Sequence, residues 1–227
     1  MTRNRLAKTI PRPNQMLRIV LPAFSGSLLF LSDYPAHLWP LQLFAFLFWI
    51  GSLDSGPKKE GFRSAWLVPL GAGAILGVFY AAPLLVVTAF PWMMAIGLGI
   101  YTVFGWMVAS WIAYRVNRWP GLHGAFAVGA VVALVEWIAT HAIPIWGTAQ
   151  SFVRVWSESP WAIQFVDITG GTGIVFVLVS AQAVVVRLLR KTLSPRRGLT
   201  SLAVMFGLIT LYNAARWFEP PISHLRV

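Results

Sequence analysis

The chain has 227 residues, of which 57% are hydrophobic and only 11% are charged, whereas soluble domains average about 25% charged residues, so an ordinary soluble protein is excluded. The net charge of +11 does not indicate nucleic-acid binding, because the Lys and Arg residues lie in short separate segments rather than on one solvated face. The lack of cysteine excludes disulfides, thiolate metal sites and a cysteine nucleophile within these residues.

A basic tail, residues 1–17, precedes the first apolar run. No small-residue cleavage site closes this run convincingly, which indicates a retained helix rather than a signal peptide. Similar runs recur along the chain, most of them near the roughly 17–25 residues that a helix needs to cross a bilayer. They predict an all-α integral membrane protein, a polytopic bundle of about seven transmembrane helices at 18–33, 36–53, 65–89, 92–114, 123–143, 165–188 and 199–217. The first two are short, so a tight helical hairpin instead of two full crossings stays open.

The distribution of Lys and Arg predicts the orientation, because cytoplasmic loops of membrane proteins are enriched in these residues. With the N-terminus inside, all but Arg154, Arg216 and Arg226 fall on the cytoplasmic side, and Asp33, Glu158, Asp167 and Glu219 fall on the other. We therefore expect a multi-pass protein of the bacterial inner membrane with a cytoplasmic N-terminus and a periplasmic C-terminus. The basic residues placed inside are Arg3, Arg5, Lys8, Arg12, Arg18, Lys58, Lys59, Arg63, Arg115, Arg118, Arg187, Arg190, Lys191, Arg196 and Arg197.

Small residues are frequent in the middle spans, as in residues 71–77 (GAGAILG) and 97–99 (GLG). In lipid, small residues let two helix backbones approach closely. These segments are therefore predicted helix contacts. A dinucleotide-binding loop is a poor interpretation of 71–77, because the spacing differs and no strand can precede it.

Glu136 is the candidate functional residue of the fifth span. An ionisable group at membrane depth is costly, and by default it either serves function or pairs with a neighbour. The structural alternative is a carboxyl that hydrogen-bonds an adjacent helix or the following loop, with His141 close enough to share that role. One Glu and one His do not form a metal site, so we expect neither a metal nor a cofactor.

The outer loop, residues 144–164, is the longest segment between spans and is rich in polar groups. It is expected to contain a short interfacial helix with Phe152, Val155 and Trp156 on its membrane face. Arg154 is placed to meet a lipid phosphate, although pairing with Glu158 four residues on is an equal alternative. No Ser-His-Asp set, metal-ligand spacing or phosphate-binding loop occurs, so no catalytic residue is predicted.

The order of residues in this region resembles the membrane domain of the apolipoprotein N-acyltransferases. The resemblance is carried by Glu136 in VEWI, by residues 143–150 (IPIWGTAQ), by residues 160–173 (PWAIQFVDITGGTG), and by the Tyr-Pro and Leu-Trp-Pro residues within 34–40. In that family a glutamate-bearing helix precedes a Gly-x-x-Gln loop, and a Gln-x5-Gly-x-x-Gly segment opens the next helix. Two departures are Thr140, where the family commonly has Arg, and Thr148-Ala149 in the Gly-x-x-Gln loop.

The resemblance implies a membrane half that gathers phospholipid and a lipoprotein or pilin-type substrate for a periplasmic nitrilase-like domain with a Glu-Lys-Cys triad. That domain would be C-terminal or supplied by a partner, with residues 18–217 as the helix bundle and 218–227 as a periplasmic linker or the start of the missing domain. The departures leave open a TraB-like conjugal transfer protein acting in pilus maturation, or a non-enzymatic envelope assembly partner. The predicted substrate-binding residues are Glu136, Trp146, Gln150, Arg154 and Trp156.

Overall fold

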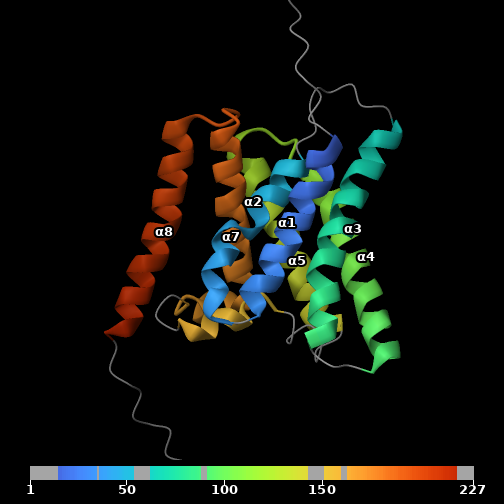
Figure 1. Cartoon of the computed structure of the whole chain (residues 1–227). Coiled ribbons are helices and arrows are strands. Elements are labelled where there is room, and N and C mark those ends of the chain that lie inside the picture. Colours follow the sequence, from blue (N-terminus) through green and yellow to red (C-terminus); the bar gives the residue numbers. More distant parts are fainter. Residues whose placement is uncertain are drawn as a thin grey trace, which may run out of the picture.

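The computed structural model describes residues 15–34, 36–53, 62–87, 91–142, 151–159 and 163–218. The regular elements in these ranges are all helices, and they alternate in direction within one bundle, so that α1 begins and α8 ends at opposite ends (Figure 1). They are α1 (Gln15–Asp33), the 3-10 helix η1 (Ala36–Leu41), α2 (Gln42–Leu53), α3 (Phe62–Val87), α4 (Trp92–Val116), α5 (Gly121–Ala142), the 3-10 helix η2 (Arg154–Glu158), α7 (Val166–Leu189) and α8 (Pro195–Trp217).

Six described helices, α1, α3, α4, α5, α7 and α8, are long and apolar enough to span a membrane. The all-α prediction is thereby confirmed for the described residues, and six such helices fit a multi-pass membrane protein, but the count of seven spans is not confirmed. The remaining predicted span, residues 36–53, consists of η1 followed by α2, which has 12 residues. An α-helix of that length rises only about 18 Å, against a hydrocarbon layer of about 30 Å.

Helix α2 lies in the centre of the bundle, in contact with α1, α3, α4 and α7. Its Trp49 is fully buried; the backbone N–H donates to Ser25 Oγ of α1 at 2.7 Å, and the indole N–H donates to Ser110 Oγ of α4 at 2.8 Å. At membrane depth no water is available to hydrogen-bond these polar groups, so the protein itself must provide their partners. They fix the position of the short helix between two long ones.

A side chain of α7 enters the hydrogen-bond ladder of α2. The Gln182 amide accepts a bond from the Phe46 N–H and donates one to the Gln42 carbonyl, both at 2.8 Å. Phe46 N–H and Gln42 C=O are the pair that an α-helix joins directly, and a side chain inserted between them is a recognised cause of helix bending. Gln182 therefore couples α7 to the start of α2.

The glycines of α3 differ in what they touch. A Cβ atom added at Gly73 would lie 2.7 Å from Met107 Cα and 2.7 Å from Ser110 Oγ, whereas Gly71 has no atom within 4 Å of that position. Gly77 likewise lies against Val103 of α4. On α4 itself, Gly97 faces open space. The predicted close approach is confirmed at Gly73 and Gly77 and absent at Gly71 and Gly97.

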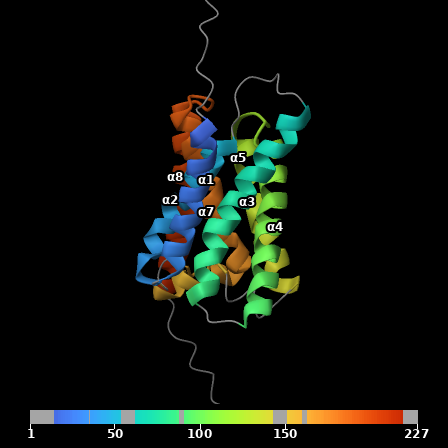
Figure 2. The same cartoon turned by 45° about the vertical axis from the view of Figure 1, so that its right-hand side comes forward.

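Helix α8 stands at the edge of the bundle and packs mainly on α7 (Figures 1 and 2). Gly198 is its one buried residue, and large apolar side chains such as Leu208 and Leu211 are 64% and 69% exposed. An apolar surface of this kind is suited to lipid, which is as apolar as leucine.

Candidate functional site

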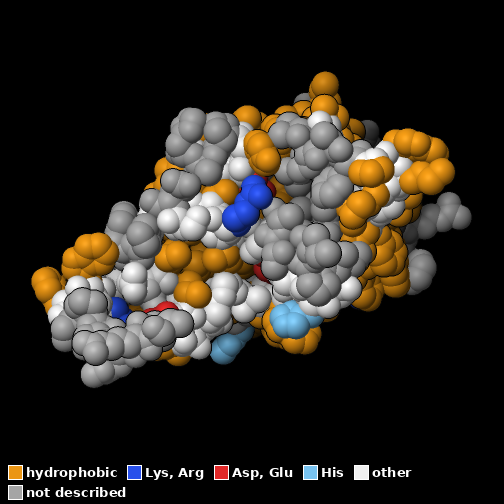
Figure 3. Space-filling view, turned by 90° about the horizontal axis from the view of Figure 1, so that it is seen from below, with side chains coloured by type: hydrophobic (Ala, Val, Ile, Leu, Met, Phe, Trp, Pro, Cys, Tyr) orange, Lys and Arg blue, Asp and Glu red, His pale blue; other side chains and the backbone are white. Residues whose placement is uncertain are grey.

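Glu136 lies on α5 near the end of the bundle on which η2 sits, and it is only 7% exposed. Its Oε1 atom accepts a hydrogen bond from the Phe152 N–H at 3.2 Å. The polar loop thus covers the carboxyl, as expected for non-helical backbone at membrane depth, where buried partners must satisfy it. In Figure 3, which looks onto this end, few charged side chains reach the surface that the described residues form.

The part of the outer loop that follows residue 150 closes the bundle from this end. Phe152 is 5% exposed and packs against the rings of Tyr80 and Trp106, with ring centroids 5.7 and 6.0 Å away. Val155 and Trp156 are buried as well. The expectation that these three side chains face the membrane is wrong, because the loop turns them inward onto the helices, where they fill the end of the core. The predicted helix is a single 3-10 segment, η2.

A second buried carboxyl, Asp33, ends α1 and is 5% exposed. Its Oδ2 accepts a hydrogen bond from the Tyr80 hydroxyl at 2.8 Å, and its Oδ1 accepts one from the Gln42 amide at 3.3 Å. The Gln42 side-chain oxygen in turn accepts a bond from the Trp156 indole N–H at 2.7 Å. This chain of bonds links α1, α2, α3 and η2. The sequence interpretation placed Asp33 in an outer turn and missed it; the available signal was an acidic residue directly after an apolar run.

An apolar pocket of about 250 Å³ opens between α4 and α5 beside Glu136. Thr102, Phe104 and Gly105 line it from α4, while Val135 and Glu136 line it from α5. The Glu136 carboxyl is one of the few polar groups in this lining. Pockets of this character, apolar with a small number of placed polar groups, are the usual sites for small amphipathic ligands.

A more polar pocket of about 370 Å³ lies on the other side of Glu136, between the end of α5 and the start of α7. Its wall from α7 depends on Gly170, which has φ +63° and interrupts the helix after its first turn. Only glycine adopts this conformation without strain. Ser151, Thr169 and Thr172 supply hydroxyls to the lining. Glu136 therefore stands at the boundary between an apolar and a polar cavity.

The five predicted substrate-binding residues separate in the structure. Glu136 lines both pockets. Arg154 is exposed, with its guanidinium 5.8 Å from the centre of the Tyr34 ring, and Trp156 is engaged with Gln42; neither is among the lining residues of the two pockets. Trp146 and Gln150 lie outside the described residues, as does the Glu158 side chain that was a candidate partner of Arg154.

His141 bonds the Trp137 carbonyl oxygen of its own helix through Nδ1 at 2.7 Å and stacks on the Trp137 ring. Within the ranges that the structure describes, no three His, Asp or Glu side chains gather closely enough to hold a metal ion. What the geometry can do chemically is hold an apolar chain on one side of a buried carboxyl and a polar group on the other.

No family model, curated protein or solved structure matches the chain. The resemblance to the N-acyltransferase membrane domain therefore rests on the sequence motifs alone.

Proposed function

We propose that this chain is a lipid-binding membrane domain of the acyltransferase type, with an acyl chain held between α4 and α5 and the polar end of the lipid at Glu136. The observation that carries the proposal is the position of Glu136 at the junction of an apolar and a polar pocket. A lipid has the same two-part chemistry, and the apolar lining gives its chain an environment equivalent to the bilayer.

Two further observations support this function. The pocket lies between two helices that are apolar enough to span a membrane, so a lipid can enter it from the side without crossing water. The buried carboxyl suits a donor group, such as the ammonium of a phosphatidylethanolamine headgroup or of a lipoprotein N-terminus, better than it suits an anion. The sequence motifs around Glu136 and Gly170 resemble those of a family that handles these substrates.

In this function the acyl-transfer chemistry belongs to a different domain or to a partner protein. A thioester carrier requires a cysteine, and the 227 residues contain none. The role of the chain is to select and position the lipid, while a nitrilase-like domain or partner provides the nucleophile.

The proposal is tested by photo-crosslinking in native membranes with a phosphatidylethanolamine that carries a diazirine on its acyl chain. Gly105 lines the pocket and has open space where a Cβ would sit, so Gly105→Phe fills the pocket without a clash inside α4. The phenyl ring then occupies the space of the acyl chain, and we expect a loss of crosslinking to α4 and α5 of about tenfold, equivalent to about 1.4 kcal/mol of binding free energy. Gly97→Phe is the matched control, because Gly97 is on the same helix, also faces open space and lies outside the pocket. Equal crosslinking of both variants and the parent would refute the proposal.

A further inference from the structure

A third and larger hollow lies at the opposite end of the bundle from Glu136. It is an open groove of about 760 Å³ between α8 and the pair formed by α5 and α7. Phe126 of α5 and Phe176 of α7 stack with ring centroids 6.2 Å apart and form one wall. Val204 and Met205 of α8 line the other. The volume is in the range of ligand sites, about 300–1,000 Å³.

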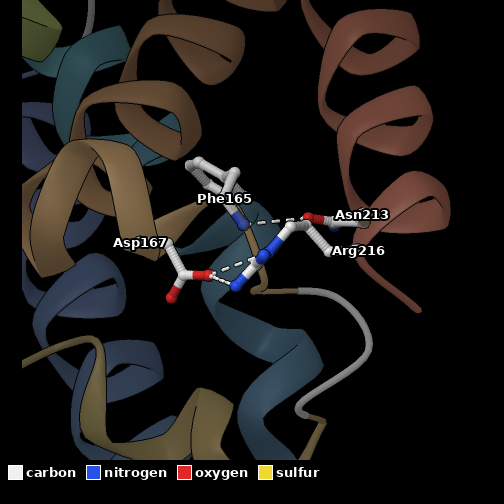
Figure 4. Close-up of polar contacts among 4 residues, drawn as sticks. All are labelled: Phe165, Asp167, Asn213 and Arg216. Atoms are coloured by element: carbon white, nitrogen blue, oxygen red, sulfur yellow. Dashed lines mark hydrogen bonds and ion pairs between the residues drawn. The ribbon is translucent and has the colours of Figure 1, made fainter. Parts of the chain in front are cut away.

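The groove exists because α7 holds α8 at both of its ends but α8 does not pack along α5. At the far end the Asn213 side chain accepts a bond from the Phe165 N–H at 3.0 Å, and Arg216 pairs with Asp167 at 2.8 Å (Figure 4). At the near end Gly198 fits closely over Leu188, where a Cβ would lie 2.5 Å from Leu188 Cδ2. The contacts at both ends of α8 therefore hold the groove between α8 and α5 open in the folded protein.

The mouth of the groove is basic and its depth is apolar. Arg196 and Arg197, both exposed, stand in the first turn of α8, and no ion pair involving them occurs among the described residues. From there the lining descends past Thr200 and Ser201 to Met205, roughly 13 Å lower at 1.5 Å per residue. Two cations above an apolar trough are complementary to an anionic headgroup above its acyl chains.

We propose that this groove binds a diacyl phospholipid with an anionic headgroup, whose phosphate lies at Arg196 and Arg197 and whose chains run along Phe126, Phe176 and Val204. The site is separate from the pocket at Glu136 and does not depend on the function proposed for that pocket. Arginine suits phosphate through its planar fork of donors. The bound lipid would fill the space between α8 and α5 and so join the edge helix to the bundle.

The test uses the purified full chain in detergent, titrated with phosphatidylglycerol and with phosphatidylcholine of the same acyl chains, and native mass spectrometry to count bound lipid. We expect Arg196→Gln with Arg197→Gln to weaken phosphatidylglycerol retention about thirtyfold, since each basic residue near a lipid surface contributes about a factor of five. Phosphatidylcholine retention should stay unchanged. The charge control is Lys191→Asn with Arg118→Gln, which removes two positive charges from the same end of the bundle outside the groove lining. If the two double variants lose phosphatidylglycerol equally, the site is not in the groove.

A steric pair tests the trough independently of charge. Thr200→Trp places an indole in the groove, while Leu199→Trp adds the same group at a neighbouring exposed position outside the lining. We expect only Thr200→Trp to reduce phosphatidylglycerol retention. A Thr200→Trp variant that retains the lipid but loses a dimer species would overturn the proposal and assign the groove to a second copy of the chain. Because all six substituted side chains are exposed, the unfolding midpoint should be similar in every variant, which separates lipid loss from misfolding.

Discussion

The Phe152 N–H and the Glu136 carboxylate are joined by a hydrogen bond of 3.2 Å that links the outer loop to α5 beneath it. Removal of a buried acceptor leaves its donor without a partner, at a cost of about 1–3 kcal/mol. We expect Glu136→Ala to lower the free energy of unfolding in detergent by this amount, and Glu136→Gln, which retains an acceptor oxygen, to lower it less. Asp167→Ala is the comparison: its ion pair with Arg216 is half-exposed, and such pairs contribute about 0–1 kcal/mol. Equal stability of Glu136→Ala and the parent would contradict the role of this bond.

The contact between α3 and α4 is tested by two glycines that are two residues apart. Gly73→Val forces a side chain into Met107 and Ser110, whereas Gly71→Val meets open space. Overpacking of a close helix contact costs about 1–3 kcal/mol or more. We therefore expect a lower unfolding midpoint and lower membrane yield for Gly73→Val alone. Similar losses in both variants would indicate an effect of helix propensity rather than of packing.

The sequence predicted the six long helices because a membrane span must satisfy its backbone hydrogen bonds within itself, which makes a long apolar run informative. The shorter run 36–53 was predicted as a span by the same signal and forms η1 and the 12-residue α2 instead. It could not predict which glycine faces a neighbour. Gly71 and Gly73 have the same local composition, and only the rotation of α3 against α4 distinguishes them. Membrane-facing residues and core residues are equally apolar, so hydrophobicity contains no information on that rotation.

In the candidate site, too, the sequence predicted what depends on local residues and missed what depends on contacts between distant segments. Glu136 was predicted because an acidic residue inside an apolar run is visible in the sequence itself. Asp33 was missed because its burial depends on Tyr80, 47 positions away on α3, and on Gln42 after the following turn. Trp156 was assigned to the membrane face because an exposed loop and a loop folded back onto the bundle have the same apolar residues; the indole bond to Gln42 decides between them.

Arg187 has a structural role in the bundle. In the sequence it counted only as one of the basic residues that indicate orientation. It is 8% exposed, and its guanidinium donates to the carbonyl oxygens of Asn117, Trp119 and Gly121 at 2.6, 3.0 and 2.6 Å. It thereby binds the turn between α4 and α5. A lysine keeps the charge but lacks the planar fork, so we expect Arg187→Lys to lower the unfolding free energy by about 1–3 kcal/mol. Arg196→Lys, on an exposed side chain, should leave stability unchanged when both are measured by chemical unfolding in one detergent.

The distribution of Lys and Arg predicts the orientation of the bundle, with its basic end in the cytoplasm. Ser194 precedes α8 and Ser157 lies in η2; both are exposed. The 24 residues of α7 separate the two ends by about 36 Å.

The native chain has no cysteine, so single substitutions give an unambiguous labelling signal. Ser194 makes no side-chain capping bond that its replacement would lose. In intact cells a membrane-impermeant thiol reagent should label Ser157→Cys and leave Ser194→Cys unlabelled until the membrane is permeabilised. Ser55→Cys, which lies outside the described residues and is predicted from the sequence to be cytoplasmic, should behave like Ser194→Cys. Labelling of Ser194→Cys but not Ser157→Cys in intact cells would invert the orientation, and labelling of both would contradict a membrane-spanning α7.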